Sequence, residues 1–277
     1  MRASSSSYSV RMAQAAKKKK SRIILAVDPR PGAAKNLKLF AKKKIGAVAG
    51  HICAVKLNFH LLLPLSAREV WDITKFAHSH GLLCIADIKL NDIESTNSAA
   101  VEHLAAMGFD AVIANPFMGP SEFAALVKKA HSMGLGVIAL VYMSHPDASA
   151  GYGLPTTTTT TTTVTTTTTV AAGGNNADNR ESRIYKLFLE RALAAGADGI
   201  VVGATQADVL GEVRGRGIEI YSPGVGAQGG DVEQAVRSGS DYLIVGRSII
   251  EAGDPAAAAR QLKKRAAAAA AGSGLSQ

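Results

Sequence analysis

The amino-acid sequence predicts a single (β/α)8 (TIM) barrel, an α/β fold, on three observations. From Ile23 onward, eight short apolar runs alternate with segments of helical periodicity. The apolar runs lack alternation with polar residues, as is typical of parallel strands buried on both faces. Polar and charged residues follow the ends of most runs, where enzymes of this fold carry their sites. The length of 277 residues suits one such barrel with short additions.

The predicted strands are rich in Val, Ile, Leu and Ala. They span residues 23–27, 54–57, 82–88, 111–114, 137–142, 199–202, 218–221 and 242–245. The segments between them carry helix signals, such as the capping box of Ser66 and Glu69. Asp254 and Pro255 open an Ala-rich last helix that Gly272 ends. A doubly wound open sheet is the competing fold, but eight repeated units and the absence of GxGxxG after the first strand favour the barrel.

Two segments depart from the barrel pattern. Residues 1–22 contain Arg and Lys but no acidic residue, which predicts a solvated, disordered tail. Residues 156–169 are all Thr except Val164, and a low-complexity run of this kind defines no strand register. The predicted organisation is therefore a basic tail at 1–22, one barrel domain at 23–272 with a Thr-rich insertion at about 148–180, and a tail at 273–277.

Composition narrows the classes of protein. With 47% hydrophobic and 19% charged residues, the chain resembles globular proteins, and no apolar run approaches the roughly 20 residues of a membrane span. Cys53 and Cys84 lie in apolar runs without metal-ligand spacing, which predicts buried thiols in a reducing, cytoplasmic compartment. The formal net charge of +9 favours anionic partners, either phosphorylated metabolites or nucleic acid.

The most informative stretch is residues 82–97, LLCIADIKLNDIESTN. Its apolar start predicts a buried strand, and alternate residues of a strand point to the same side. Asp87 and Lys89 should therefore project together from the strand end, with Asp92 just beyond. On its own, this pattern is equally typical of a structural ion pair, because a buried charge needs a partner of opposite sign.

The other predicted strands decide between these readings, because their ends also carry polar side chains. These are Asp28, Lys56, Asn115, Ser144, His145, Gln228 and Arg247. The carboxyl ends of barrel strands meet at one rim, so these groups should converge. A purely structural set of charges would be scattered over both ends of the barrel.

The last two strand ends predict a phosphate site. Four glycines, Gly224, Gly226, Gly229 and Gly230, allow backbone N–H groups to approach an anion. A helix should begin near Asp231, and the Arg247 side chain that follows the last strand suits phosphate oxygens. Phosphate sites after strands 7 and 8 recur in this fold.

These residues resemble a known family. The phrase from Asp87 to Asn97 is similar to the DxKxxDIxxT signature of orotidine 5'-phosphate decarboxylase, in its prokaryotic, particularly archaeal, form. The resemblance extends from Ile23 to about Ile250 and includes the phrases AVD, VK, MSHP, SPGVGAQGGD and VGR. Sugar-phosphate enzymes of the same superfamily share DxKxxD but use Mg²⁺, and the MSHP and PGVGAQ phrases favour the decarboxylase.

The resemblance implies a role for each matching residue. Lys89 would donate a proton to C6 of the pyrimidine, with Asp87 beside the substrate carboxylate. Lys56 would complete a charged row with Asp87, Lys89 and Asp92. Substrate contacts would come from Asp28 and Lys56 to the ribose, Ser144 to the pyrimidine, Gln228 and Arg247 to the phosphate, and from Thr96, Pro223 and Gly246.

The same resemblance implies partners and cofactors. The substrate would be orotidine 5'-monophosphate and the product UMP, with neither cofactor nor metal. The active form would be a homodimer in which Asp92 and Thr96 reach the partner's site. Two alternatives stay open: a Mg²⁺-dependent sugar-phosphate lyase, and an inactive barrel whose basic residues 1–22 bind nucleic acid in a salt-dependent manner. We do not expect nucleic acid or a membrane among the partners of the leading hypothesis.

Overall fold

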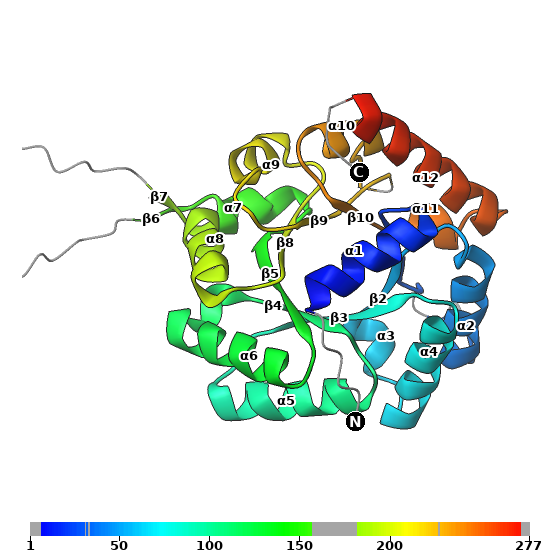
Figure 1. The fold of residues 1–277 in the computed structure, drawn as a ribbon, viewed down its shortest axis with the longest axis horizontal. Helices are drawn as coiled ribbons and strands as arrows, with labels where there is room; N and C mark the ends of the chain where they lie inside the picture. Colours follow the sequence, from blue (N-terminus) through cyan, green and yellow to red (C-terminus); the bar gives the residue numbers. More distant parts are fainter. Residues whose placement is uncertain (1–6, 31, 33, 157–181, 227, 273–277) are drawn as a thin grey trace, which may run out of the picture.

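Eight parallel strands close into a barrel in the computed structural model of the chain, which describes residues 7–30, 32, 34–156, 182–226 and 228–272. The strand order around the barrel is β1-β10-β9-β8-β5-β4-β3-β2, which confirms the predicted TIM barrel (Figure 1). The strands are β1 (Ile23–Val27), β2 (Ala54–Asn58), β3 (Leu83–Leu90), β4 (Ala111–Ala114), β5 (Gly136–Tyr142), β8 (Gly199–Val202), β9 (Ile220–Pro223) and β10 (Tyr242–Val245).

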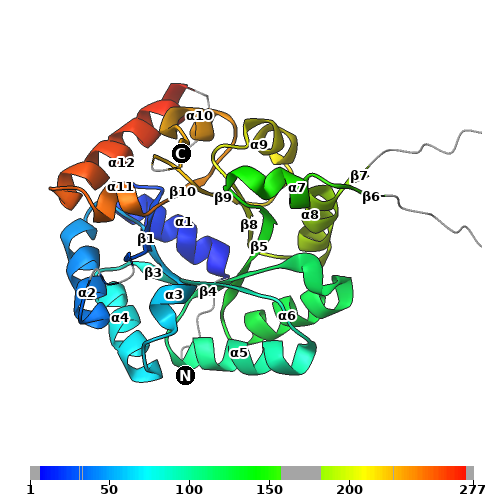
Figure 2. The ribbon, with the colours of Figure 1, turned by 180° about the vertical axis from the view of Figure 1, so that it is seen from behind.

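Helices surround the barrel and cover the outer face of every strand (Figures 1 and 2). The longer ones are α2 (Leu37–Val48), α4 (Ala67–Ser79), α5 (Glu94–Ala106), α6 (Pro120–Ser132), α8 (Ile184–Ala195), α9 (Ala207–Val213), α10 (Val232–Arg237) and α12 (Pro255–Gly272). Short turns α3 (Phe59–Leu62), η1 (Pro116–Met118), η2 (Pro146–Ala148), α7 (Ser149–Tyr152) and α11 (Arg247–Ile250) follow strand ends. The predicted capping box is present, since Ser66 and Glu69 bond each other's backbone N–H groups.

The core has two layers, one between strands and helices and one inside the barrel. Within the barrel, alternate residues of each strand point inward. The inward-facing residues Ala26 and Ile85 are apolar. The next inward-facing residues toward the carboxyl ends of these strands are Asp28 and Asp87, which are charged. This continued alternation delivers the charged side chains to the rim.

The prediction of a disordered tail at 1–22 is wrong for residues 8–19, which form helix α1 (Tyr8–Lys19). Its buried residues Tyr8, Met12, Ala15 and Ala16 recur at helical spacing and pack with the residues inside the barrel. In both ribbon views α1 lies across the barrel opening (Figures 1 and 2). The helix therefore closes the end of the barrel at which the strands begin.

Basic residues of α1 bind carbonyl groups at the ends of other helices. Lys19 Nζ donates to Ala49 O at 2.8 Å and to His80 O at 2.7 Å, at the C-caps of α2 and α4. Arg11 Nη2 donates to Gly134 O at 2.8 Å, just beyond α6. Cations are favourable at helix C-termini, where carbonyl groups lack partners. Part of the basic run therefore serves the fold.

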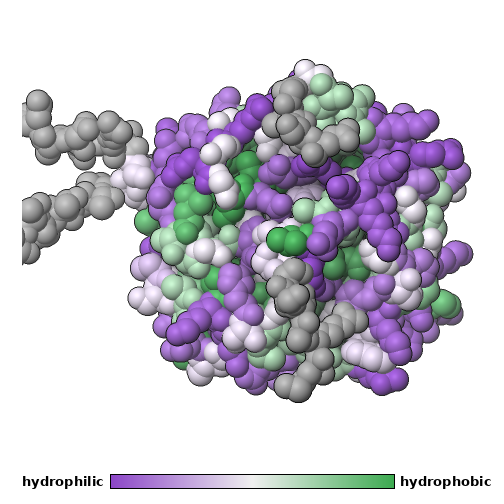
Figure 3. Space-filling model, viewed as in Figure 1, coloured by the Kyte–Doolittle hydropathy of each residue, from purple (hydrophilic) through white to green (hydrophobic). Residues whose placement is uncertain are grey.

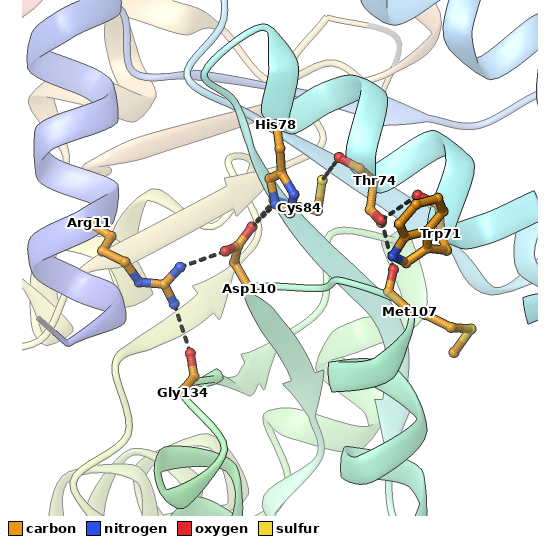
Figure 4. Close-up of polar contacts among 8 residues, drawn as sticks. All are labelled: Arg11, Trp71, Thr74, His78, Cys84, Met107, Asp110 and Gly134. Carbon is orange, nitrogen blue, oxygen red and sulfur yellow. Dashed lines mark hydrogen bonds and ion pairs between the residues drawn. The ribbon is translucent and has the colours of Figure 1, made fainter. Parts of the chain in front are cut away.

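A buried carboxylate anchors α1 to the barrel (Figure 4). Asp110 accepts from Arg11 Nη1 at 2.5 Å and from the Cys84 backbone N–H at 2.9 Å, and lies 2.7 Å from His78 Nε2. Burial would raise the pKa of Asp110, but His78, the Cys84 N–H and Arg11 outweigh it and lower the pKa. Asp110 is thus held ionised between three groups from separate elements.

The same turn precedes two other strands. Asp110, Asp198 and Asp241 each follow a glycine by two residues, and each carboxylate accepts from the backbone N–H of a neighbouring strand. The glycines have φ between 70° and 117°, which favours glycine over other residues. The repeated Gly-x-Asp turn therefore aligns adjacent strands where they begin.

Glu219, immediately before β9, makes stability depend on pH. Its carboxylate accepts from Tyr221 Oη at 3.1 Å, and burial raises the pKa of Glu219 to about 7. Because this folded-state pKa lies above the usual value, ionisation opposes folding. Stability should fall as pH rises from about 4.5 to 7, by on the order of 3 kcal/mol. We expect Glu219→Gln to unfold at a higher urea concentration than wild type at pH 8 and at the same one at pH 4.5; equal midpoints at both pH values would contradict this.

The predicted insertion is described only at its two ends. Strands β6 (Pro155–Thr156) and β7 (Ser182–Arg183) pair antiparallel, and residues 157–181, which include most of the Thr-rich run, lie outside the described residues. Residues 1–6 and the predicted tail at 273–277 also lie outside them. No helix in the described ranges is both long and apolar enough to cross a membrane.

Candidate active site

A cavity of about 290 Å³ opens where the barrel strands end. It brings together nine of the residues predicted to catalyse the reaction or bind the substrate, namely Asp28, Lys56, Asp87, Lys89, Ser144, Pro223, Gln228, Gly246 and Arg247. They come from the ends of β1, β2, β3, β5, β9 and β10. The convergence expected from the barrel topology is therefore present.

The floor of the cavity holds a charged cluster. The Asp87 carboxylate lies between two ammonium groups: its Oδ2 contacts Lys56 Nζ, and its Oδ1 accepts from Lys89 Nζ at 2.8 Å. Lys56 Nζ also donates to Asn58 Oδ1. The β2–β3 register explains the approach, since Asn58 is paired with Asp87. Both oxygens of Asp87 are thus occupied by lysines.

Burial makes this cluster electrostatically strong. The side chains of Lys56 and Asp87 are only 5% and 9% exposed, whereas Lys89 is 41% exposed and faces the cavity. Burial would raise the pKa of Asp87, but the two ammonium groups outweigh it and lower the pKa. Burial lowers the pKa of Lys56, and Asp87 opposes that shift. Charges screened from water in this way interact strongly with a bound ligand.

The backbone at Lys89 is unusual. Its φ of 48° lies in the left-handed region, which a residue with a side chain seldom adopts. The pairing of β3 with β4 shifts register between Ala86 and Leu90, so Lys89 sits in an irregular part of the strand. Such conformations cluster at functional sites. Regular strand alternation therefore explains why the Asp87 side chain points into the barrel. The irregular backbone sets the direction of the Lys89 side chain.

The loop after β9 is shaped by its glycines. Gly230 N donates to Gly224 O at 3.1 Å, and Gly226 N donates to Gly230 O at 2.8 Å. Gly224 has φ 96°, and a Cβ there would lie 2.8 Å from Gln228 Oε1. The loop ends at Asp231, after which α10 begins as predicted, and the Asp231 side chain caps that helix. Exposed Gln228 reaches the cavity from this loop.

Arg247 begins α11 directly after β10, and its exposed side chain lines the cavity beside this loop. A guanidinium group can bind phosphate oxygens through two N–H donors. Ser144 lines the cavity next to the same loop, since a Cβ on Gly224 would lie 3.0 Å from Ser144 Cβ. The cavity thus has a charged floor and an end formed by the glycine-rich loop and Arg247.

Two predicted site residues lie outside the cavity lining. Asp92 and Thr96 are exposed, in the loop after β3 and the first turn of α5. Asp92 Oδ1 accepts from Ile93 N at 2.8 Å, and the Asp92 carbonyl accepts from Asn97 Nδ2 at 2.6 Å. In a single chain these two side chains are therefore not assembled with the charged cluster.

Sequence reasoning missed several residues near the site. Asn58 contacts Lys56, and Met143 lines the cavity beside His145, which the sequence placed at this rim. His60 Nε2 lies 3.0 Å from Asp28 Oδ1. The signal for Asn58 was available, because it follows Lys56 by two positions in the same strand. His60 belongs to the short helix α3, which the hydrophobic periodicity did not predict.

A possible metal-binding group lies elsewhere. Within the described residues, one group of His, Cys and acidic side chains has ligand atoms close enough to share a cation: His78, Cys84 and Asp110. It lies at the end of the barrel closed by α1, and Arg11 already binds the carboxylate. That guanidinium disfavours a second cation there.

Comparison with known proteins identifies similar sequences. Residues 21–262 match the model of the Orotidine 5'-phosphate decarboxylase / HUMPS family. The chain is 29% identical over 247 residues to orotidine 5'-phosphate decarboxylase of Methanococcoides burtonii, covering 88% of this chain and 96% of the relative. It is 32% identical to the enzyme of the same name from Thermococcus kodakarensis, covering 77% of this chain and 84% of the relative.

Solved structures have the same fold. Orotidine 5'-phosphate decarboxylase from Pyrococcus horikoshii superposes with a TM-score of 0.65 at 29% identity, covering 88% of this chain and 98% of that one. The enzyme from Methanocaldococcus jannaschii, complexed with the inhibitor BMP, has a TM-score of 0.69 at 24% identity, covering 88% and 98%.

Proposed function

Because the chain belongs to the Orotidine 5'-phosphate decarboxylase / HUMPS family, we propose that it decarboxylates orotidine 5'-monophosphate to UMP in pyrimidine biosynthesis. The observation that supports this most is the cluster that the buried Lys56 and Asp87 form with the half-exposed Lys89 in the floor of a nucleotide-sized cavity. In the proposed reaction, this cluster would supply fixed charge next to the developing carbanion.

The proposed reaction needs electrostatic stabilisation above all. The bond between C6 and the carboxylate breaks, CO₂ leaves, and the electron pair remains on C6, where the ring delocalises it poorly. The Lys89 ammonium stabilises this developing charge and then transfers its proton to C6. Solvent restores the proton to Lys89. Asp87 and Lys56 keep Lys89 oriented, since Lys89 Nζ donates to Asp87 Oδ1 at 2.8 Å.

Asp87 has a second proposed role. Its ionised carboxylate would lie beside the substrate carboxylate, and loss of CO₂ would relieve their repulsion. The remaining proposed contacts are made to parts of the nucleotide that are distant from the reacting carbon. Asp28 and Lys56 bind the ribose, Ser144 binds the pyrimidine, and Gln228 and Arg247 bind the phosphate. Binding energy from these remote groups aligns the ring over Lys89.

The charged cluster also bears on the Mg²⁺-dependent alternative. A cation at the cavity floor would need free carboxylate oxygens. Both oxygens of Asp87 are bound to lysine ammonium groups, and Asp28 Oδ1 lies 3.0 Å from His60 Nε2. This donor set favours the decarboxylase without a metal.

The substrate assay separates the two activities. Purified protein is mixed with orotidine 5'-monophosphate, and the loss of orotate-ring absorbance is followed alongside chromatographic detection of UMP. A parallel reaction contains a ketose phosphate and Mg²⁺. The proposal predicts UMP in the first reaction and no turnover in the second; turnover of the ketose phosphate alone would favour the lyase.

We further propose a homodimer in which Asp92 and Thr96 complete the partner's site. Both side chains are exposed, and Ile93 beside them is 62% exposed, an apolar surface suited to an interface. Isologous contact of two such surfaces would give two equivalent sites. For location, we propose the cytoplasm, on the support of Cys53, a buried cysteine that forms no disulfide.

A mixture of two inactive variants tests the shared site. Lys89→Ala and Asp92→Ala are unfolded together, refolded and assayed. If Asp92 acts in the partner's site, half of the dimers are mixed and each has one intact site, so about a quarter of wild-type activity should return. If Asp92 acts within its own chain, every site in the mixture lacks one group and no activity returns.

A further inference from the structure

The proposed reaction uses none of the cations at the closed end of the barrel. Here the last turn of α1 lies beside α12, since Lys263 Nζ donates to Lys19 O at 2.8 Å. We call the exposed or half-buried cations of these two segments the basic face. They are Lys17, Lys18, Lys20, Arg260, Lys263 and Lys264. Figure 3 shows hydrophilic side chains along this side of α1.

The cations of the basic face lack carboxylate partners within the part of the chain that the structure describes. Among the described residues, none of its six cations forms an ion pair with a carboxylate. The neighbouring Arg265 contrasts with them, because it binds both Asp231 and Glu233. Lys19 also differs, because its ammonium group binds the helix ends beneath. Lys263 Nζ donates to one carbonyl, that of Lys19, and has further N–H donors, so the six cations of the basic face can still bind an external anion.

Mutual repulsion within the basic face is visible in its neighbours. Burial lowers the pKa of His51, and Lys263 and Arg260 lower it further. Burial also lowers the pKa of Lys19, with Lys18 and Lys263 adding to the shift. Cations of both α1 and α12 thus act on Lys19, and two cations of α12 act on His51. Such repulsion would be relieved by a bound polyanion.

We propose that the basic face binds the phosphate backbone of duplex nucleic acid without sequence preference. Lysine and arginine contacts to phosphates supply most of the affinity in such binding. The large apolar side chains exposed in the described residues lie outside the last turn of α1 and outside α12. Base stacking and membrane insertion both require such side chains, so neither a single strand nor an inserted membrane helix fits as well.

A salt titration tests the proposal. Fluorescence anisotropy of a labelled duplex of about 20 base pairs is measured with the full chain between about 50 and 200 mM salt. Binding should weaken steeply with salt, with a dissociation constant of about 10⁻⁵ M near 0.15 M. The Lys17→Gln/Lys18→Gln variant should bind about tenfold more weakly, with a salt slope smaller by about 2. The Arg260→Gln/Lys264→Gln variant should behave alike.

The control variant is Lys75→Gln/Lys128→Gln, which removes two exposed cations from α4 and α6. It has the same net charge as the other doubles and should bind like wild type. Equal weakening in all three variants would show a general charge effect and overturn the proposal, as would binding to anionic vesicles but not to the duplex. His51 gives a second readout, since duplex binding should raise its pKa, measured by NMR. Decarboxylation should be unchanged in all three variants, so this test is independent of the proposed catalytic function.

Discussion

The Lys89→Ala variant is expected to lose activity by on the order of 10⁴-fold in kcat, which is the largest effect that we predict for one substitution. Lys89 supplies both the charge that stabilises the carbanion and the proton that ends the reaction. Its removal also leaves Asp87 with one lysine partner instead of two. The measurement is the initial rate of orotate absorbance loss at saturating orotidine 5'-monophosphate.

The folded state of this variant must be checked separately, because Lys89 has φ 48°. Alanine and lysine have similar strain at this φ, so we expect urea unfolding midpoints close to wild type. Lys75→Ala, on the exposed face of α4, is the matched control and should keep full activity. A Lys89→Ala enzyme with wild-type folding and a rate within tenfold of wild type would show that another group protonates C6.

The Arg11→Met variant is expected to lower the free energy of unfolding by about 3 kcal/mol, the largest loss of stability that we predict for a substitution. The Arg11 guanidinium is the cation of α1 that binds Asp110, whose side chain is only 5% exposed. Methionine preserves much of the length of the side chain but leaves the buried carboxylate with fewer partners. Chemical unfolding in urea at pH 7 gives the value.

The pH dependence of this loss follows from the lowered pKa of Asp110. A carboxylate with a lowered folded-state pKa stabilises the fold above its unfolded pKa and loses that contribution as pH falls below about 4. The difference between Arg11→Met and wild type should therefore shrink below pH 4. Arg22→Met is the control, since Arg22 is 45% exposed and lies 3.6 Å from Asp241, and should cost less than about 1 kcal/mol. A loss under 1 kcal/mol in Arg11→Met would show that the Arg11–Asp110 ion pair contributes little to the docking of α1.

The barrel and most of its site could be predicted because both depend on short-range patterns. Strand alternation places Asp87 on the inner face, and barrel topology brings Asp28 and Arg247 to the same rim although they are far apart in sequence. The family resemblance was carried by the same residues and is confirmed by the match over residues 21–262. The assignment of each contact to the substrate stays a prediction.

Helix α1 could not be predicted from composition. Its exposed lysines give the segment the charge of a disordered tail, while the buried stripe of Tyr8, Met12, Ala15 and Ala16 contains small residues that score as weakly hydrophobic. The partners that hold it, including Asp110 and the carbonyls at His80 and Gly134, are distant in sequence. Docking of this kind is a tertiary effect, and local patterns do not report it.

The irregular backbone at Lys89 and the contact of Asn58 with Lys56 could not be predicted from the sequence either. A register shift in β3 and the hydrogen bond between Lys56 and Asn58 depend on how neighbouring strands pair. Sequence periodicity predicts which side a residue faces, but it does not predict local irregularity. Asp92 and Thr96 raise a related point, because a site shared between chains is not visible in one chain.

We propose that the enzyme uses the charged cluster, and no metal ion, to decarboxylate orotidine 5'-monophosphate. The most direct test is the decarboxylation rate of metal-stripped wild-type protein in excess EDTA, compared with the same protein supplied with Mg²⁺. Fixed side-chain charge predicts equal rates in the two conditions. A rate that disappears in EDTA and returns with Mg²⁺ would contradict the account.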